Sequence, residues 1–296
     1  ERYVRPKLEP LGISDLAGNS EEIENFNTPV AETPVPQDTV AEASDGGVGE
    51  QSLATVDSPL TQLFFQKAKD GPTLVKEFSL AADSISTPQA LNDLLIRKFQ
   101  IPSHRLRGPM PIEVREFHRD DLAKLLAELG FNHGAEIGVA EGKYSEVLCK
   151  ANPHLQLLCV DPWHHYAGNP QGKTKEKNEF AFREAQRRLK GFSVTFDTRL
   201  SMEAVRDVKD GSLDFVYIDA HHSYDYFMED LINWSRKVRI GGIISGDDAY
   251  RLDPNRWGSG PMEGIYDYTR AHKIEPWFLI AAHRSVDFFY VKGDWK

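Results

Sequence analysis

The first residues suited to chemistry surround the end of a short apolar segment at residues 135–139. Glu136, Gly138 and Gly142 there follow the spacing E-x-G-x-x-x-G. Glycine permits a tight turn, and at Gly142 it lets the backbone approach a ligand that a side chain would exclude. A dinucleotide pyrophosphate prefers bare N–H groups at a helix N-terminus, so Glu136 suits it poorly. We expect Glu136 to face a cationic amino group instead.

A second acid, Asp161, ends the next apolar segment, 23 residues after Gly138. Taken alone, an acid at a strand end often only caps the following helix. A carboxylate at this point can also accept hydrogen bonds from both hydroxyls of a ribose. Together, the two motifs predict a cofactor site at one edge of a sheet.

Three more carboxylates follow two later apolar segments. Asp219 ends one of them, and Asp247 and Asp248 end the other. Acids packed together repel one another unless protons or a cation neutralise them, and Mg²⁺ prefers oxygen ligands. We predict that Asp219, Asp247 and Asp248 hold Mg²⁺. The alternative is that Asp247 caps a turn and Asp248 is solvated.

Two histidines directly follow the first of these acids, in the segment Asp219-Ala220-His221-His222. A histidine three positions after a metal ligand can reach a bound hydroxyl, and its ordinary pKa suits a general base. We therefore expect His222 to be the base, with His221 as second choice. His221 could instead pack against Tyr224 or Trp234 and only order the loop.

The elements that must position these residues alternate regularly after residue 111. Amphipathic helices are expected at residues 118–129, 144–150, 176–189, 202–208, 226–237 and 264–272. Strands are expected between them at residues 135–139, 156–161, 193–196, 213–219 and 242–246. Repeated strand–helix–strand units predict an α/β fold with a doubly wound, mostly parallel sheet. Two last strands, 276–282 and 286–291, should pair as an antiparallel hairpin, which makes seven strands.

Four blocks of this sequence resemble a known family. EIGVAEGKYSEVL, VDPW, LDFVYIDAHHSYDYFMEDLINW and VRIGGIISGDDA look like the S-adenosylmethionine-dependent class I methyltransferases, which have a Rossmann-like fold. They are most similar to the metal-dependent branch that methylates oxygens of sugars and small molecules (methyltransferase family 24-like). The resemblance covers residues 112–292. Ala140 departs from it, because many class I enzymes have a second glycine there.

The resemblance assigns roles to individual residues. It implies that Glu136, Gly138 and Gly142 line the methionine part of S-adenosylmethionine, and that Asp161 holds its ribose. It places Ser201 near the adenine and the carboxylate of Asp219 near both cofactor and metal.

The expected reaction is transfer of the sulfonium methyl group to an acceptor hydroxyl. Mg²⁺ would lower the pKa of that hydroxyl, and His222 would remove its proton. The expected acceptor is a sugar or another small molecule. Two alternatives stay open at this point. One is a nicotinamide-dependent oxidoreductase, which the glycine spacing and the antiparallel end disfavour, and the other is a non-catalytic methyltransferase-like scaffold.

Two irregular inserts, residues 163–178 and 250–263, follow strands at the same edge and have the Gly, Pro and aromatic content of lids. We expect them to select the acceptor. Basic side chains in them could meet an anionic acceptor or simply be solvated: Lys173, Lys175, Lys177, Arg251 and Arg256.

The N-terminal part of the chain differs in composition from the rest. Residues 1–58 hold 12 acidic and 3 basic residues, so they carry most of the net charge of −10. This segment is too poor in apolar residues to fold by itself, and we expect a disordered acidic linker or tail. Residues 59–111 are expected to be a short helical extension, with helices at 61–69 and 87–99. Residues 112–296 are the expected methyltransferase domain.

Composition also excludes some partners. Without its acidic tail the chain is nearly neutral, so we expect no nucleic acid partner, and no apolar run is long enough to predict a membrane span. Cys149 and Cys159 are expected to be buried thiols in a reducing compartment, which suggests a cytoplasmic protein. The chain begins with Glu1 and shows no signal-peptide pattern near it. A homo-oligomer is compatible with the sequence, which does not decide it.

Overall fold

The computed structural model describes residues 87–166, 174–249, 260–282 and 285–295. All of them belong to one compact unit, residues 57–296. The expected disordered segment 1–58 and the expected helix at 61–69 lie outside the described residues. So do most residues of the two expected inserts, and with them Lys173, Arg251 and Arg256.

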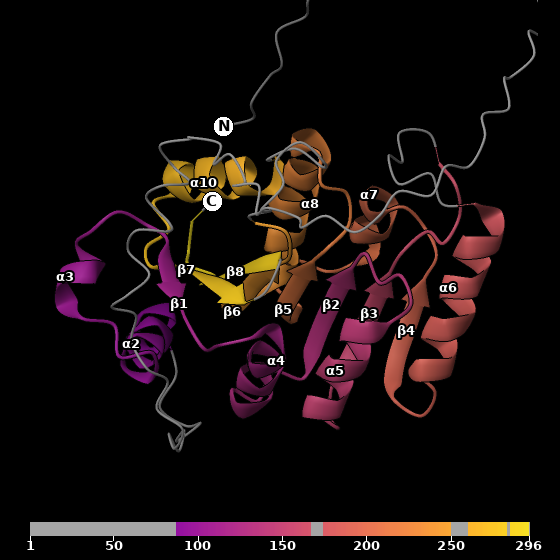
Figure 1. Ribbon diagram of the computed structural model, residues 1–296, viewed down its shortest axis with the longest axis horizontal. Helices are drawn as coiled ribbons and strands as arrows, with labels where there is room; N and C mark the ends of the chain where they lie inside the picture. The colour runs from indigo at the N-terminus through magenta and orange to yellow at the C-terminus, as the bar shows by residue number, and fades with distance from the viewer. Residues whose placement is uncertain (1–86, 167–173, 250–259, 283–284, 296) are drawn as a thin grey trace, which may run out of the picture. The chain divides into compact units, whose positions relative to one another are not determined.

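A single sheet of eight strands forms the centre of the unit, in the order β1-β7-β8-β6-β5-β2-β3-β4. Its strands are β1 (Ile112–Val114), β2 (His133–Ile137), β3 (Gln156–Val160), β4 (Ser193–Asp197), β5 (Leu213–Ile218), β6 (Val238–Gly246), β7 (Trp277–Ala282) and β8 (Ser285–Val291). Only β8 is antiparallel to its neighbours, β6 and β7. The mostly parallel sheet and the C-terminal hairpin are therefore confirmed (Figure 1).

The structure adds one strand to the seven that the sequence predicts. β1 is three residues long and pairs with the outer edge of β7. It follows the turn-rich residues 105–111. A run of three residues is too short for alternation to stand out, so the pattern alone did not reveal it.

Helices cover both faces of the sheet (Figure 1). On one face lie α2 (Pro88–Lys98), α4 (Arg119–Glu128), α5 (Lys143–Ala151) and α6 (Lys175–Arg188). On the other lie α7 (Ser201–Ala204), the short 3₁₀ helix η2 (Val205–Asp207), α8 (Tyr224–Lys237) and α10 (Gly260–His272). α3 (Ser103–Leu106) connects α2 to β1. Alternate residues of each strand face the two layers; Phe215 and Tyr217 pack into one and Val216 and Ile218 into the other.

The helix expected at residues 87–99 is present as α2, and it packs on the sheet. Thr87 Oγ1 accepts a hydrogen bond from Ala90 N at 3.1 Å, which caps the helix start. Leu91 and Leu95 are fully buried. The ring of Phe99, just after α2, packs edge-on against Phe278 of β7. Part of the expected N-terminal extension thus shares the core of the domain.

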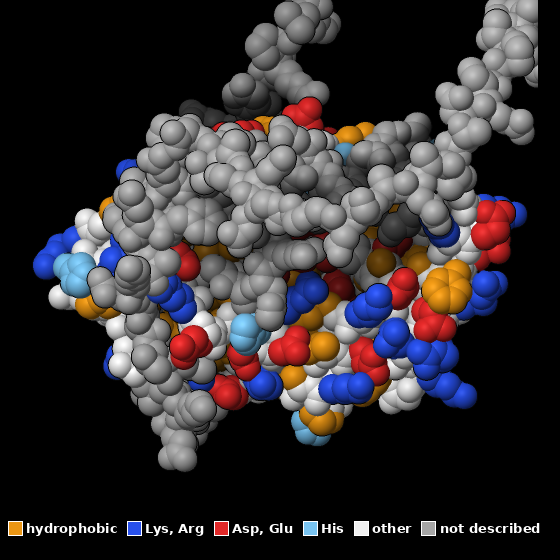
Figure 2. All heavy atoms as spheres, in the orientation of Figure 1, with side chains coloured by type: hydrophobic (Ala, Val, Ile, Leu, Met, Phe, Trp, Pro, Cys, Tyr) orange, Lys and Arg blue, Asp and Glu red, His pale blue; other side chains and the backbone are white. Residues whose placement is uncertain are grey.

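The outer surface of the helices mixes both signs of charge. Figure 2 shows acidic and basic side chains interspersed on the face turned to the viewer. Many of them pair locally: Arg187 lies 2.9 Å from Glu184, and Glu146 lies 2.6 Å from Lys150 and 3.1 Å from Arg188. The arrangement agrees with the near-neutral charge of residues 59–296.

Two further features concern cysteines and membrane spans. Cys149 and Cys159 are both free and buried, as expected. Burial raises the pKa of the Cys149 thiol to about 12. In the described part of the chain, no helix combines the length and the apolar character that crossing a membrane requires.

Leu95→Ala is expected to lower the free energy of unfolding of the whole domain by about 2–5 kcal/mol, because it leaves a cavity in the shared core. Urea denaturation of the full chain, followed by tryptophan fluorescence, measures the change. Arg97→Ala, at an exposed position of the same helix, is the control and should be nearly neutral. An unchanged transition in Leu95→Ala would mean that α2 does not share the core.

Candidate functional site

A cavity of about 650 Å³ opens at the carboxyl ends of the central strands. The register aligns Ile137 with Val160 and with Ile218, and Ile218 with Gly246, so four strands end side by side. The volume is within the range of small-ligand sites. Nine of the ten predicted site residues line the cavity: Glu136, Gly138, Asp161, Ser201, Asp219, His221, His222, Asp247 and Asp248.

Position 138 must be glycine because the backbone at Asp219 lies very close to it. Gly138 has φ +90°, and a Cβ at this position would lie 2.0 Å from the carbonyl oxygen of Asp219. No side chain fits there without moving one of the two strand ends. Gly138 thus allows the turn after β2 to lie directly against the turn after β5.

Gly142, the tenth predicted residue, is not part of the cavity wall. It precedes α5 with φ +71°, and a Cβ there would come within 3.1 Å of the Ala185 Cα on α6. The sequence suggested a close approach to a ligand; the structure shows a close approach to a helix. The glycine is still needed, but for packing and backbone conformation.

Asp161 orders the turn that borders the cavity. Its Oδ2 accepts hydrogen bonds from the backbone N–H groups of Val139 and Ala140, at 3.1 and 2.9 Å. Its Oδ1 accepts one from Trp163 N at 2.9 Å. A carboxylate has about four lone-pair sites, so these three hydrogen bonds leave Asp161 with about one for a ligand hydroxyl.

Glu136 is a buried carboxyl at the floor of the cavity. Burial raises its pKa to about 8; the hydrogen bond from Ser145 opposes this rise, and the charge of Asp219 adds to it. Its carboxyl is therefore largely protonated at neutral pH. A cationic group placed beside it would favour the ionised form.

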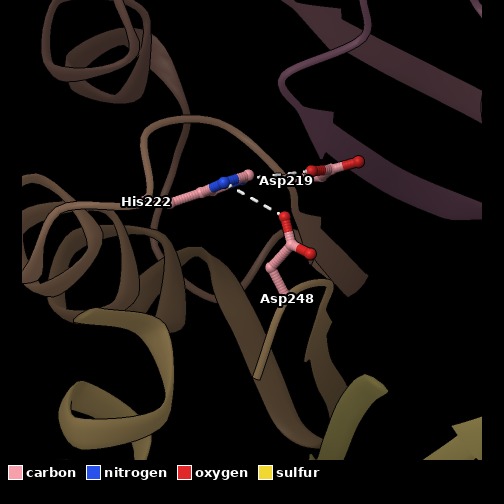
Figure 3. A group of neighbouring side chains, drawn as sticks. All are labelled: Asp219, His222 and Asp248. Carbon is pink, nitrogen blue, oxygen red and sulfur yellow. Dashed lines mark ion pairs between the residues drawn. The ribbon is translucent and has the colours of Figure 1, made fainter. Parts of the chain in front are cut away.

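The acidic cluster is assembled differently from the prediction (Figure 3). His222 lies between two carboxylates, with Nε2 at 3.5 Å from Asp219 Oδ1 and Nδ1 at 3.0 Å from Asp248 Oδ2. Asp247 Oδ2 instead lies 3.1 Å from Nη1 of Arg119 on α4. Asp248 has φ +56°, in the left-handed region that few residues other than glycine occupy. The structure thus brings Asp219, His222 and Asp248 together and pairs Asp247 with Arg119; that the three aspartates hold a metal ion stays a prediction.

The donor atoms of this trio fit a divalent ion. Asp219, His222 and Asp248 each offer one atom, and these atoms lie within 4.8 Å of one another. Carboxylate oxygens suit Mg²⁺ and Mn²⁺, and an imidazole nitrogen also suits Mn²⁺ and Zn²⁺. Burial raises the pKa of Asp219 to about 6, and the hydrogen bond from His222 opposes this rise. A bound cation would favour the ionised carboxylates.

His221 has a packing role at the cavity rim. Its ring lies against the ring of Tyr226, with centroids 4.3 Å apart, and its Nδ1 accepts a hydrogen bond from Ser223 N at 3.2 Å. These contacts order the loop, which is the alternative role that the sequence left open for His221. The aromatic partner is Tyr226 rather than Tyr224 or Trp234.

Two basic side chains expected in an insert belong to a helix. Lys175 and Lys177 are exposed in the first turn of α6, away from the cavity lining. Thr174 Oγ1 caps this turn by accepting from Lys177 N at 3.3 Å.

Among the cavity residues that sequence reasoning missed, Asp230 is a buried acid. Asp230, on α8, is 4% exposed, and Ser201 Oγ donates a hydrogen bond to its Oδ1. Trp234 Nε1 donates to Ser201 Oγ at 2.7 Å, which fixes the hydroxyl. Burial raises the pKa of Asp230 to about 7. The available signal was an acid on the apolar face of an amphipathic helix, between Phe227 and Leu231.

Comparison with known proteins identifies a match for this region. Residues 135–249, which include all ten predicted site residues, match the model of a family described as a methyltransferase domain. No curated protein matches the chain.

Several solved structures resemble this one. The N-methyltransferase NodS from Bradyrhizobium japonicum WM9 is 16% identical, with 60% of this chain and 95% of that chain covered and a TM-score of 0.43. An O-methyltransferase from Bacillus cereus in complex with SAH is 15% identical, with 79% and 97% covered and a TM-score of 0.44. An O-methyltransferase family protein from Burkholderia thailandensis is 14% identical, with 71% and 60% covered and a TM-score of 0.43.

Glu136→Gln is expected to stabilise the fold increasingly as pH rises from 4.5 to 8. The pKa of Glu136 is raised from 4.5 to about 8 in the folded chain, so folding takes up a proton in this window. The contribution of this group to stability is fully present below pH 4.5 and is lost as pH rises through 8. At about 1.4 kcal/mol per pKa unit, the variant should gain several kcal/mol at the upper end. Urea denaturation at a series of pH values measures the gain.

Glu184→Gln is the matched control. Glu184 lies at a partly exposed position of α6, and the hydrogen bond from Arg187 lowers its pKa. It stays ionised across the same window, so the difference between this variant and the unchanged chain should not vary with pH. If the difference in free energy of unfolding between Glu136→Gln and the unchanged chain were equally independent of pH, the carboxyl of Glu136 would not be buried and protonated.

Proposed function

We propose that this chain, an S-adenosylmethionine-dependent methyltransferase whose residues 135–249 match the methyltransferase-domain family, methylates a hydroxyl oxygen of a sugar or another small molecule with the help of Mg²⁺. The observation that carries the proposal is the position of His222 between Asp219 and Asp248 at the cavity wall. A hydroxyl must lose its proton to become a good nucleophile, so a base in this place has a use that an amine acceptor would not require.

The cofactor would lie along the floor of the cavity. Glu136, ionised by the contact, would hold the amino group of the methionine part, and Asp161 would accept from a ribose hydroxyl. Ser201 and Asp230 stand together at another part of the wall. Within the described residues only Oδ1 of Asp230 accepts a hydrogen bond, and its Oδ2 could accept one from the adenine amino group.

The acceptor would bind at the end of the cavity where Asp219, His222 and Asp248 meet. In this scheme the carboxylates of Asp219 and Asp248 would hold the divalent ion, and the imidazole of His222 would serve as the base rather than as a third ligand. The ion would lower the pKa of an acceptor hydroxyl. His222 would take the hydroxyl proton onto its imidazole. The oxygen would then form a bond to the methyl carbon as the carbon–sulfur bond breaks. The electron pair of that bond would stay on sulfur, which leaves a neutral thioether.

Most of the rate enhancement in this scheme comes from orientation. Holding donor and acceptor in line replaces a bimolecular encounter by a step within one complex. Asp247 would act indirectly, since its pairing with Arg119 and its hydrogen bond from Asp248 N at 2.6 Å hold the turn that carries Asp248.

Asp248→Asn is expected to lose binding of Mn²⁺, used as a paramagnetic substitute for Mg²⁺, and to lose methyl transfer to hydroxylated acceptors. The affinity for S-adenosylhomocysteine should stay close to that of the unchanged chain. Electron paramagnetic resonance measures the binding of Mn²⁺, and calorimetry measures the binding of S-adenosylhomocysteine. Methyl transfer is measured as label passed from methyl-labelled S-adenosylmethionine to a panel of hydroxylated acceptors. Asp247→Asn is the matched control and should keep the ion. If it loses Mn²⁺ as completely as Asp248→Asn does, the ligands are the aspartate trio after all.

Asp230→Asn is expected to weaken binding of S-adenosylhomocysteine about 10- to 100-fold, because a buried hydrogen bond to a charged group is worth about 1.5–3 kcal/mol. The unchanged chain should also discriminate against S-inosylhomocysteine, which lacks the amino group, and the variant should discriminate less. Calorimetric titration measures both affinities. Asp225→Asn, exposed on the same helix, is the control. Equal discrimination in Asp230→Asn and the unchanged chain would remove Asp230 from the adenine site.

A further inference from the structure

A second cavity, of about 430 Å³, lies on the opposite side of α8 from the first. Met228, Ile232 and Arg236 line it from α8, each one turn after the other, whereas Tyr226 and Asp230 face the first cavity. Its other walls come from α10, which packs beside α8 (Figure 1), and from the residues that follow β8. The methyl-transfer reaction proposed above makes no use of this cavity.

The charged lining of the second cavity is mainly basic. Arg236, His272 and Lys292 contribute three basic side chains, and Asp267 contributes one carboxylate. That carboxylate is already engaged, by Arg270 Nη2 at 2.9 Å and by the hydroxyl of Tyr224 at 3.0 Å. The local field in the cavity therefore favours an anion.

Among these residues, Lys292 gives the strongest indication of an anion site. It is only 9% exposed, and the described residues provide no carboxylate within ion-pair distance of its ammonium. Its Nζ lies 5.1 Å from the centre of the Trp295 ring. Burial and the charge of Arg236 lower the pKa of Lys292, and the charges of Asp210 and Asp294 oppose this in part. Burial and the charge of Lys292 lower the pKa of His272. An anion between these groups would relieve both effects.

The remaining walls are apolar and partly flat. The rings of Tyr268 and His272 pack with their centroids 4.4 Å apart. Trp295 folds back against the chain, and a Cβ at Gly293 would lie 2.2 Å from its ring, so a larger residue there would displace the ring. Ile232 is 37% exposed beside the cavity. The apolar surface thus suits the body of an aromatic ligand, and the basic groups suit its charge.

We propose that this second cavity binds a small aromatic anion, a carboxylate or sulfonate carried on a flat apolar ring system. The ammonium of Lys292 and the guanidinium of Arg236 pair with the anionic group. The ring system lies against Ile232, Tyr268 and Trp295. Binding involves no covalent step and is separate from the cofactor cavity.

The test is calorimetric titration of the full chain with naphthalene-2-sulfonate, with and without saturating S-adenosylhomocysteine. We expect saturable one-to-one binding that S-adenosylhomocysteine does not displace. Lys292→Met should weaken it by about tenfold or more, as expected for loss of a charge-assisted contact. Arg236→Gln, at an exposed position that folding does not need, should weaken it in the same direction. Ala271→Trp, which fills the cavity from α10, should abolish it.

Two controls separate specific from general binding. Lys209→Met removes the same charge from an exposed position outside the cavity and should leave the affinity unchanged. Naphthalene-2-methanol, which lacks the charge, should bind more weakly than the sulfonate. The proposal is overturned by absence of saturable binding, by displacement with S-adenosylhomocysteine, or by equal affinity in Arg236→Gln, Ala271→Trp and the unchanged chain. Because these variants are judged by the sulfonate alone, failure of the proposed methyl transfer would not affect the result.

Discussion

The backbone contact between Gly138 and Asp219 is the constraint on which the active-site cavity depends. Only a glycine can lie this close to the carbonyl of Asp219. Hydrogen bonds on both sides hold the contact, from Gly138 N to Val160 O at 2.8 Å and from Asp219 N to Ile137 O at 2.7 Å. These bonds align the ends of three parallel strands. Every residue that follows one of these strands is thereby turned toward the same space, and the carboxylates gather there because of the backbone geometry.

Gathering acids in a low-dielectric space has an electrostatic cost, which the surrounding elements offset one acid at a time. Ser145 donates to Glu136 from α5, and Ser201 donates to Asp230 from the start of α7. Arg119 reaches Asp247 from α4. In each case the partner comes from a different segment of the chain. The helices around the sheet therefore decide which acids stay paired and which remain available to a ligand.

Much of the fold could be read from the pattern of apolar residues, because helices and strands of this type carry local periodicity. The strand ends at Glu136, Asp161 and Asp219 were found in this way. Contacts made by a single side chain with a distant partner were not. Gly142 was assigned to a ligand because spacing shows that a glycine is needed without showing what approaches it. The short strand β1 and the buried acid Asp230 on α8 were missed for related reasons: one is too short for a pattern, and the other depends on what covers its helix.

The sequence by itself determined the order of the elements, the α/β class and the edge of the sheet at which the site would form. These follow from periodicity and from the parallel topology that it implies. Only the tertiary structure decided how the acids at that edge are shared. Arg119 precedes Asp247 by 128 positions, and the positive φ of Asp248 is uncommon for residues other than glycine. Pairing at such separation depends on the packed positions of whole helices, and these positions are a property of the assembled core rather than of any local stretch of chain.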